Sequence, residues 1–238
     1  MEKAMSDSQP ASVRSDQSGW MDADAYIFDI DGTLLNTRDL VHWNALHQAM
    51  LEVYGVDTTI EGIAYHGKTD IGILGAALER AGVTERAFRR DLPKALAVLC
   101  REVDRHAEQL VADQCTCIVD VLQKLHSAGK LLGVASGNLQ SVGWHKVKAA
   151  GLREAFCFGC FSDNCESRVE IFTNAIMEVH SRLGSGASVC FVGDTPADIQ
   201  AAHWLEAKVI AVSTGTFTID QLATYAPDFL VSSCQELL

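Results

Sequence analysis

The sequence has little that would direct the protein to a membrane or to nucleic acid. It contains no apolar run of about 18 residues or more, so we expect no membrane-spanning helix and no membrane partner. Lys and Arg total 19 against 31 Asp and Glu, and the net charge of -12 disfavours nucleic acid as a partner. A small anionic substrate stays compatible with this charge, because a local group of bases or a metal ion can outweigh the global field.

The first residues lack the apolar segment of a secretory signal. Residues 1–22 are rich in Ser, Asp, Gln and Ala, which predicts a disordered tail. Because the 8 cysteines accompany no export signal, we expect a reducing, cytoplasmic location.

The cysteines also lack the spacing of a zinc site. Cys115 and Cys117 form one close pair, but no second pair and no suitably spaced histidines accompany them. Cys157, Cys160 and Cys165 follow in a largely apolar stretch. We interpret all five as small core residues.

The chain is organised around residues 25–34, whose sequence is AYIFDIDGTL. The apolar run is short and rich in β-formers, which predicts a buried parallel strand. It ends in Asp29 and Asp31, at the strand end where open α/β sheets bind ligands. Crowding two acids there costs stability, so their presence indicates chemistry.

Helical and strand patterns alternate after this stretch and again from about residue 115. The predicted strands are 25–30, 131–135, 156–161, 188–192, 209–212 and a short edge strand at 229–231. The intervening helices are predicted near 116–128, up to 150, at 168–183 and from 196. This alternation predicts an α/β fold, a three-layer Rossmann-like parallel sheet with helices on both faces.

Residues 37–112 have a different pattern. Apolar residues recur at helical spacing in three successive segments, with Thr37 and Thr69 as possible N-caps and no convincing strand. We therefore predict a helical cap domain at 37–112, inserted into a core domain made of 23–36 and 113–238. An insertion after the first strand lies over the strand ends and can act as a lid.

Further polar side chains fall at the ends of the later strands. Ser136 follows the second strand, Asp194 follows the fourth with Asp198 four residues on, and Arg168 begins the helix after the third. Each has a purely structural interpretation, as a turn residue, a helix-start carboxylate or a surface charge. Since parallel strands end at one edge, together these residues predict a single site.

The acids of this site suit a hard cation. Asp29, Asp31 and Asp194 offer oxygen ligands of the kind that Mg²⁺ prefers. An EF-hand is excluded, because its sixth and twelfth positions counted from Asp29 are Leu34 and Leu40. A carboxylate can attack phosphorus while a second carboxyl moves protons, and Ser136 and Arg168 can hold the remaining phosphoryl oxygens.

The motifs resemble those of the haloacid dehalogenase-like superfamily of hydrolases. The first motif matches at 29–34, the second at Ser136 and the fourth at 193–199, while Arg168 stands where the family usually has lysine. The similarity extends over about 25–231. It is greatest to the phosphoglycolate phosphatase-like and β-phosphoglucomutase-like members, which have a helical cap after the first motif.

This resemblance implies a role for each matched residue. Asp29 would be the nucleophile and a Mg²⁺ ligand, and Asp31 the acid/base, which also binds Mg²⁺ through its backbone carbonyl. Thr33 would orient the site, Asp194 would be the third protein ligand, and Asp198 would support it. Asp31 favours phosphate esters, because the dehalogenase branch usually lacks this second acid.

Substrate contacts are expected from the cap and from the second motif. In relatives the loop equivalent to 65–70 faces the cleft, so Lys68 and His66 are candidate substrate-binding residues, together with Gly137 and Asn138 beside Ser136. A solvated loop charge explains Lys68 equally well. The Schiff-base lysine of phosphonoacetaldehyde hydrolases is a further model that Lys68 permits but does not single out.

The function predicted is a Mg²⁺-dependent phosphatase that hydrolyses a small phosphorylated metabolite through an aspartyl-phosphate. A sugar phosphomutase with the same intermediate is an alternative, and a non-catalytic phospho-ligand binding module is another. The oligomeric state stays open.

Overall fold

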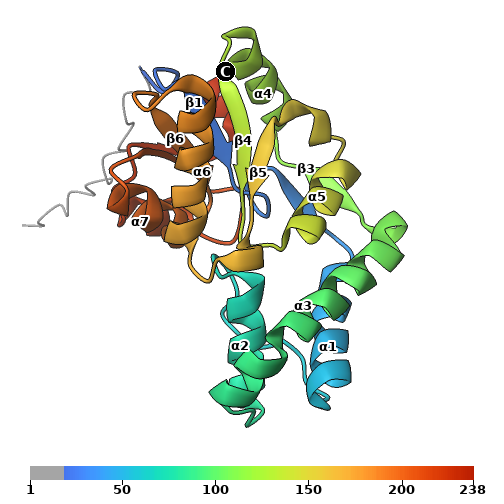
Figure 1. Cartoon of the computed structure of the whole chain (residues 1–238). Helices are drawn as coiled ribbons and strands as arrows, with labels where there is room; N and C mark the ends of the chain where they lie inside the picture. The colour runs from blue at the N-terminus through green and yellow to red at the C-terminus, as the bar shows by residue number, and fades with distance from the viewer. Residues whose placement is uncertain (1–18) are drawn as a thin grey trace, which may run out of the picture.

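A computed structural model describes residues 19–238, so residues 1–18 of the predicted tail lie outside the described part. Its centre is a six-stranded parallel sheet in the order β5-β4-β1-β6-β7-β8 (Figure 1). The strands are β1 Ala25–Phe28, β4 Leu131–Ala135, β5 Phe158–Cys160, β6 Val189–Gly193, β7 Lys208–Val212 and β8 Phe229–Val231. The first strand of the chain therefore lies in the middle of the sheet, between β4 and β6.

Helices cover both faces of the sheet, as Figure 1 shows. The side chains of β1 point alternately to the two faces of the sheet. Tyr26 and Phe28 pack in the apolar cluster of one face, and Ala25 and Ile27 pack in the cluster of the opposite face. The helices are α4 Ile118–Ser127, α5 Gln140–Ala149, α6 Arg168–Leu183, α7 Pro196–Trp204 and α8 Ile219–Ala223. Full burial of a side chain such as Phe28 contributes about 1.5–3 kcal/mol. The predicted three-layer α/β fold is confirmed.

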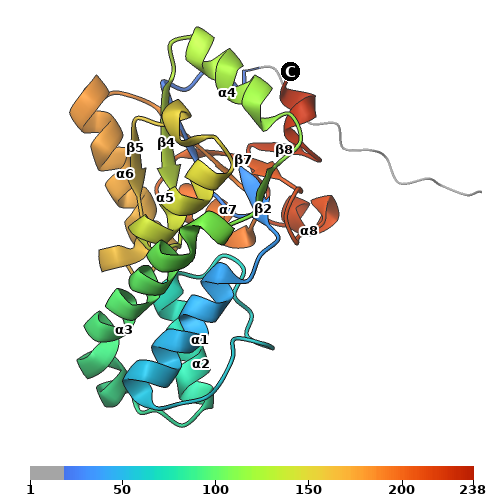
Figure 2. The same cartoon turned by 90° about the vertical axis from the view of Figure 1, so that its right-hand side faces the viewer.

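Three helices pack together beneath the carboxyl ends of the strands. They are α1 Val41–Tyr54, α2 Asp70–Arg80 and α3 Glu85–His106 (Figure 2). Their shared apolar cluster contains Leu46, Met50, Leu74, Leu78 and Leu99, all essentially inaccessible. The same cluster includes Leu139 and Val142 at the start of the helix at 140–149, so the three helices share part of their core with the α/β part of the chain.

A two-stranded antiparallel sheet joins this helical part to the six-stranded sheet. It pairs β2 Leu35–Thr37 with β3 Ala112–Gln114, which are the outgoing and returning connections. The prediction of helix from residue 37 is therefore wrong at both ends of the segment. Thr37 lies in β2, and α1 begins at Val41, whose N–H donates to Asp39 Oδ1 at 2.8 Å. Pairing satisfies the backbone groups of both connections, which isolated linkers would leave to water.

Three smaller expectations are corrected. Trp20, assigned to the tail, is buried against Tyr26, whose hydroxyl donates to the Trp20 carbonyl at 2.6 Å. The third strand is shorter than 156–161. Cys157 is exposed rather than in the core, Cys117 is partly buried, and the other three cysteines considered for zinc are buried.

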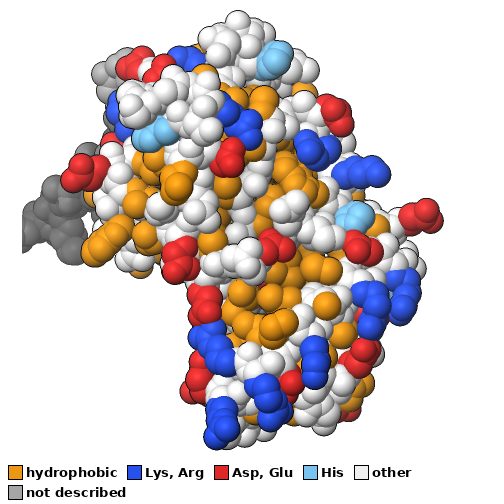
Figure 3. Space-filling view, viewed as in Figure 1, with side chains coloured by type: hydrophobic (Ala, Val, Ile, Leu, Met, Phe, Trp, Pro, Cys, Tyr) orange, Lys and Arg blue, Asp and Glu red, His pale blue; other side chains and the backbone are white. Residues whose placement is uncertain are grey.

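Short 3₁₀ turns complete the chain at Ala107–Gln109, Arg153–Ala155, Ser162–Asn164 and Cys234–Leu237. Within residues 19–238 none of the helices is both long and apolar enough to cross a membrane. On the face shown in Figure 3, charged side chains lie at the edges and bottom of the lower part, over α2 and α3, and a hydrophobic patch lies above them, toward the α/β part.

Candidate functional site

Three adjacent strands of the sheet end in polar residues. Asp29 follows β1, Ser136 follows β4, and Asp194 follows β6, and all three side chains are buried. Because these strands are parallel neighbours, their carboxyl ends bring residues more than a hundred positions apart to one edge. The convergence expected from the sequence is present.

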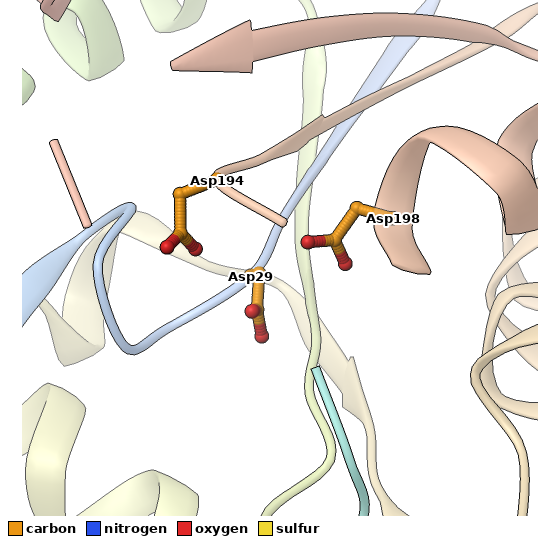
Figure 4. A group of neighbouring side chains, drawn as sticks. All are labelled: Asp29, Asp194 and Asp198. Atoms are coloured by element: carbon orange, nitrogen blue, oxygen red, sulfur yellow. The ribbon is translucent and has the colours of Figure 1, made fainter. Parts of the chain in front are cut away.

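Asp29, Asp194 and Asp198 form a compact acidic group, with one carboxylate oxygen of each within 4.8 Å of the others. Figure 4 shows Asp194 and Asp198 on either side of Asp29. Gly32, with a φ of +83°, permits this crowding, because a Cβ there would lie 2.3 Å from Asp194 Oδ2. A glycine in the first motif is therefore required by the position of an acid from the fourth.

The acidic group has perturbed proton affinities. Burial raises the pKa of Asp194 to about 8, and the neighbouring Asp29 and Asp198 carboxylates add to the rise. Burial also raises the pKa of Asp29 to about 6, although Arg168 opposes the change. Like charges buried together favour protonation or a bound cation.

Arg168 is the cation placed among these acids. The capping box of Ser167 and Glu170 starts α6, and Arg168 follows as its first residue. Its Nη1 lies 3.1 Å from Asp29 Oδ1 and its Nη2 3.4 Å from Asp29 Oδ2, so two separate nitrogens of one planar group face the two oxygens, whereas a lysine has a single nitrogen. Arg168 Nε also lies 3.3 Å from Asp198 Oδ1. The structure thus brings Arg168 into the site.

Asp31 points into a different network from Asp29. Lys146 Nζ lies 2.9 Å from both Asp31 carboxylate oxygens and donates to Asn138 Oδ1 at 2.9 Å. Asn138 Nδ2 donates to Asp31 Oδ2 at 2.8 Å and to Ser136 Oγ at 2.9 Å. Burial alone would raise the pKa of Asp31, but Lys146 and the Asn138 hydrogen bond outweigh it, and the pKa is lowered. Asp31 is therefore held as a carboxylate.

Lys146 is the site residue that sequence reasoning missed. It lies in α5 and is buried together with Val142, Gly143 and Val147 on that helix. The available signal was the position of Lys146, four residues after Val142 and next to Val147. A lysine at such a position indicates a partner, since an unpaired lysine is rarely buried.

Thr33 and Thr195 orient the acids of the fourth motif. Thr33 Oγ1 donates to Asp194 Oδ1 at 3.1 Å. Asp198 Oδ2 accepts hydrogen bonds from the N–H and the hydroxyl of Thr195, at 3.1 and 2.6 Å, in the capping box of α7. Asp198 is thus fixed by the helix start, while its Oδ1 has no hydrogen bond and faces Arg168.

The donor set fits a divalent metal. Asp29 and Asp194 present hard oxygen atoms next to each other, and their raised pKa values record an excess of negative charge that a cation would relieve. The Asp31 side chain is engaged by Lys146 and Asn138, so the close acidic group contains Asp198 in its place. The Asp31 contribution expected from the resemblance is through its backbone carbonyl, not through this carboxylate.

A cavity of about 570 Å³ extends from the acids to the three-helix part. Both sets of predicted substrate contacts line it, Lys68 and His66 from one side and Gly137 and Asn138 from the other. The two sides touch closely, because a Cβ on Gly137 would lie 2.4 Å from the Lys68 carbonyl oxygen. The cavity is therefore shared between residues of the helical segment and of the sheet.

Asp70 connects the two sides of this cavity through hydrogen bonds. Its N–H donates to the Gly137 carbonyl at 2.8 Å, and its Oδ2 accepts from the Leu139 N–H at 2.7 Å. From the sequence, Asp70 was interpreted only as a residue at the start of a helix, and α2 does begin at Asp70.

The parallel sheet and the buried carboxylates at its strand ends fit an α/β hydrolase. The chain belongs to the haloacid dehalogenase-like hydrolases, because the model of that family matches residues 26–212.

Proteins of known name are similar to the chain in sequence or in fold. The chain is 25% identical to the pyrophosphatase PpaX of Anoxybacillus flavithermus over 92% of its own length and 96% of that protein. Among solved structures, CbbY of Rhodobacter sphaeroides in complex with phosphate has a TM-score of 0.67 at 17% identity, covering 90% of this chain and 96% of CbbY. The β-phosphoglucomutase of Clostridium difficile has a TM-score of 0.62 at 17% identity, covering 91% and 93%.

Proposed function

We propose that this enzyme is a Mg²⁺-dependent phosphatase that hydrolyses a small phosphomonoester through an aspartyl-phosphate at Asp29. The observation that supports this most is the environment of Asp29. Its buried carboxylate borders the cavity, contacts Arg168 at two points and lies beside Asp194. A second carboxylate, Asp31, lines the same cavity in a separate network.

In the first step an Asp29 oxygen attacks the substrate phosphorus, and the bond between phosphorus and the alcohol oxygen breaks. Asp31, which carries the proton it took from water in the second step of the preceding turnover, gives it to that departing oxygen. Ser136 and Arg168 hold the other phosphoryl oxygens, and Arg168 keeps Asp29 in place. The alcohol leaves, and the phosphoryl group stays on Asp29.

In the second step water attacks the phosphorus of the aspartyl-phosphate. Asp31 accepts a proton from that water, and the bond between phosphorus and the Asp29 oxygen breaks. Phosphate leaves and the Asp29 carboxylate is restored. The contact with Lys146 suits this step, because it holds Asp31 in the ionised form that accepts protons.

Mg²⁺ would be held by the carboxylates of Asp29 and Asp194 and by the backbone carbonyl of Asp31, with Asp198 in support. When bound, it supplies positive charge for the phosphoryl oxygens. Thr33 keeps the Asp194 carboxylate oriented toward Asp29 through its hydrogen bond.

The alcohol part of the substrate would contact Lys68 and His66 from the helical segment 37–112, which acts as the cap, and Gly137 and Asn138 from the core. Inorganic pyrophosphate is a candidate to be tested alongside phosphomonoesters, because the curated relatives are named pyrophosphatases. A cytoplasmic location stays a prediction.

A phosphate-release assay over a panel of phosphorylated metabolites and pyrophosphate, with and without Mg²⁺, tests the proposal. We expect release that requires Mg²⁺ and is lost in Asp29→Asn, with circular dichroism showing an intact fold. Absence of release across the panel, or full activity of Asp29→Asn, would contradict it. Product analysis with a sugar phosphate and a bisphosphate activator separates hydrolysis from the phosphomutase alternative.

A further inference from the structure

The cavity is larger than its catalytic end requires. Its volume of about 570 Å³ lies within the range of about 300–1,000 Å³ typical of sites for drug-sized ligands. A phosphoryl group beside Asp29 and Arg168 occupies only one end. The rest of the space is available to the alcohol part of the substrate.

Besides polar residues, the cap contributes a group of apolar side chains to the cavity lining, here called the wall. It is made of side chains of α1, of the loop between α1 and α2, and of α2: Trp43, Leu46, Ile60, Tyr65 and Ile73. Trp43 and Leu46 are three residues apart in α1 and so lie on one face of the helix. The wall would be of no use to a substrate made of phosphate alone.

Two aromatic rings of this wall belong to a row of ring contacts that runs from the cap to the core. The Trp43 and Tyr65 rings lie edge to face with centroids 6.4 Å apart, and the centroids of the Tyr65 and His66 rings are 4.3 Å apart. His66 lies 6.3 Å from Phe217, and its ring nitrogens lie 3.2 Å from Thr216 Oγ1. Trp43, Tyr65 and His66 line the cavity, whereas Phe217 does not.

Part of this row is not used by the fold. The Tyr65 side chain is 39% exposed, so part of its ring is open to a ligand. A row that only held the cap on the core would bury Tyr65. Trp43 packs partly on the apolar cluster of the cap, which fixes the position of its ring.

Aromatic side chains with a free edge or face bind another ring in stacked or edge-to-face contact, beyond the effect of burying apolar area. Resting on the phosphatase function above, we propose that Trp43 and Tyr65 bind an aromatic ring in the alcohol part of the substrate. The substrate class is thus a phosphomonoester whose alcohol has an aromatic or heteroaromatic ring. His66 and Thr216 position the loop that presents Tyr65.

The test uses probes that differ only in aromaticity. 2-Phenylethyl phosphate and 2-cyclohexylethyl phosphate have the same chain and similar size, and ethyl phosphate lacks the ring. We expect kcat/KM of the wild-type enzyme to be about fivefold higher for the phenyl than for the cyclohexyl compound, through KM. Ethyl phosphate is expected to have the highest KM.

Trp43→Leu and Tyr65→Leu should each abolish the difference in kcat/KM between the phenyl and cyclohexyl probes. Phe217→Leu is the matched control, because it removes a ring of the same row that does not line the cavity. It should keep the difference. Equal kcat/KM for the two ring compounds in the wild type, or an equal loss in Phe217→Leu, would overturn the proposal.

A binding experiment separates this inference from the phosphatase function. Calorimetric titration of the Asp29→Asn variant with the same probes needs no turnover. Tighter binding of the phenyl probe that is lost with Trp43→Leu or Tyr65→Leu supports the ring site even if no phosphate is released by the wild type. Equal binding of both ring probes contradicts it even if the enzyme is a phosphatase.

Discussion

Lys146 Nζ lies 2.9 Å from each carboxylate oxygen of Asp31, although the two residues are 115 positions apart in the chain. The lysine side chain is 4% exposed, so its charge is held inside the protein and directed at one acid. This pair fixes the orientation of Asp31 and favours its ionised form. In the proposed mechanism, Lys146 is therefore a positioning residue for proton transfer by Asp31.

Lys146→Met should lower kcat by about tenfold or more, because Asp31 loses two hydrogen bonds that orient it. The pKa of Asp31 should rise, since burial remains and the opposing charge is gone. Because the rate depends on ionised Asp31, the fall in kcat on the acid side of the pH profile should therefore occur at a higher pH than in the wild type. A pH profile of kcat from about pH 4 to about pH 9 measures the change.

The matched control for this change is Lys148→Met, which alters an exposed lysine of the same helix. Its pH profile should overlay that of the wild type. An unchanged profile in Lys146→Met would show that Lys146 does not act on Asp31.

Mg²⁺ should stabilise the protein more at about pH 8 than at about pH 6. The pKa of Asp194 is raised from 3.8 to about 8, so without metal its contribution to stability is present at low pH and is lost as the pH rises through about 8. A cation bound to ionised Asp194 replaces that contribution. At 100 times its dissociation constant it adds about 2.7 kcal/mol.

Thermal unfolding with and without Mg²⁺ measures this effect in the wild type and in Asp194→Asn. Because Asn resembles the protonated acid, the variant should match or exceed the metal-free wild type in Tm at about pH 8 and gain little from Mg²⁺. Asp220→Asn, an exposed change in the first turn of α8, should respond to Mg²⁺ as the wild type does. An equal rise in Tm for Asp194→Asn would argue against Asp194 as a ligand.

Glu206→Gly should raise the free energy of unfolding by up to about 1 kcal/mol. Glu206 follows α7 with a φ of 55°, a left-handed conformation that glycine adopts without the Cβ penalty. For a chain of this size the expected increase in Tm is about 2–4 °C. Glu79→Gly, an exposed change near the end of α2, should instead lower Tm, and a fall in both variants would contradict the strain at Glu206.

The strand ends could be predicted from the sequence because each combines two local signals. The apolar run before Asp29 and that before Asp194 each stop at an acid, and parallel strands end at one edge whatever their order. The sheet order was not readable, since it depends on contacts between distant segments. Arg168 could be placed near the site only because it starts the helix after a strand.

Residues whose role depends on tertiary contact were missed or misplaced. Lys146 has no local motif, and only the packing of α5 turns it toward Asp31. Thr37 is of a residue type that favours helix N-caps, but pairing with Ala112 places it in a strand. A three-residue strand has too little periodicity to be recognised, and its partner lies at the other end of the cap.

Trapping the proposed intermediate at Asp29 tests the central claim most directly. Enzyme turning over substrate with Mg²⁺ is quenched with borohydride, which reduces an aspartyl-phosphate to homoserine, and the peptide that contains residue 29 is analysed by mass spectrometry. The account predicts homoserine at position 29 only when both substrate and Mg²⁺ are present. Steady release of phosphate with Asp29 unmodified, or with the modification at another acid, would contradict it.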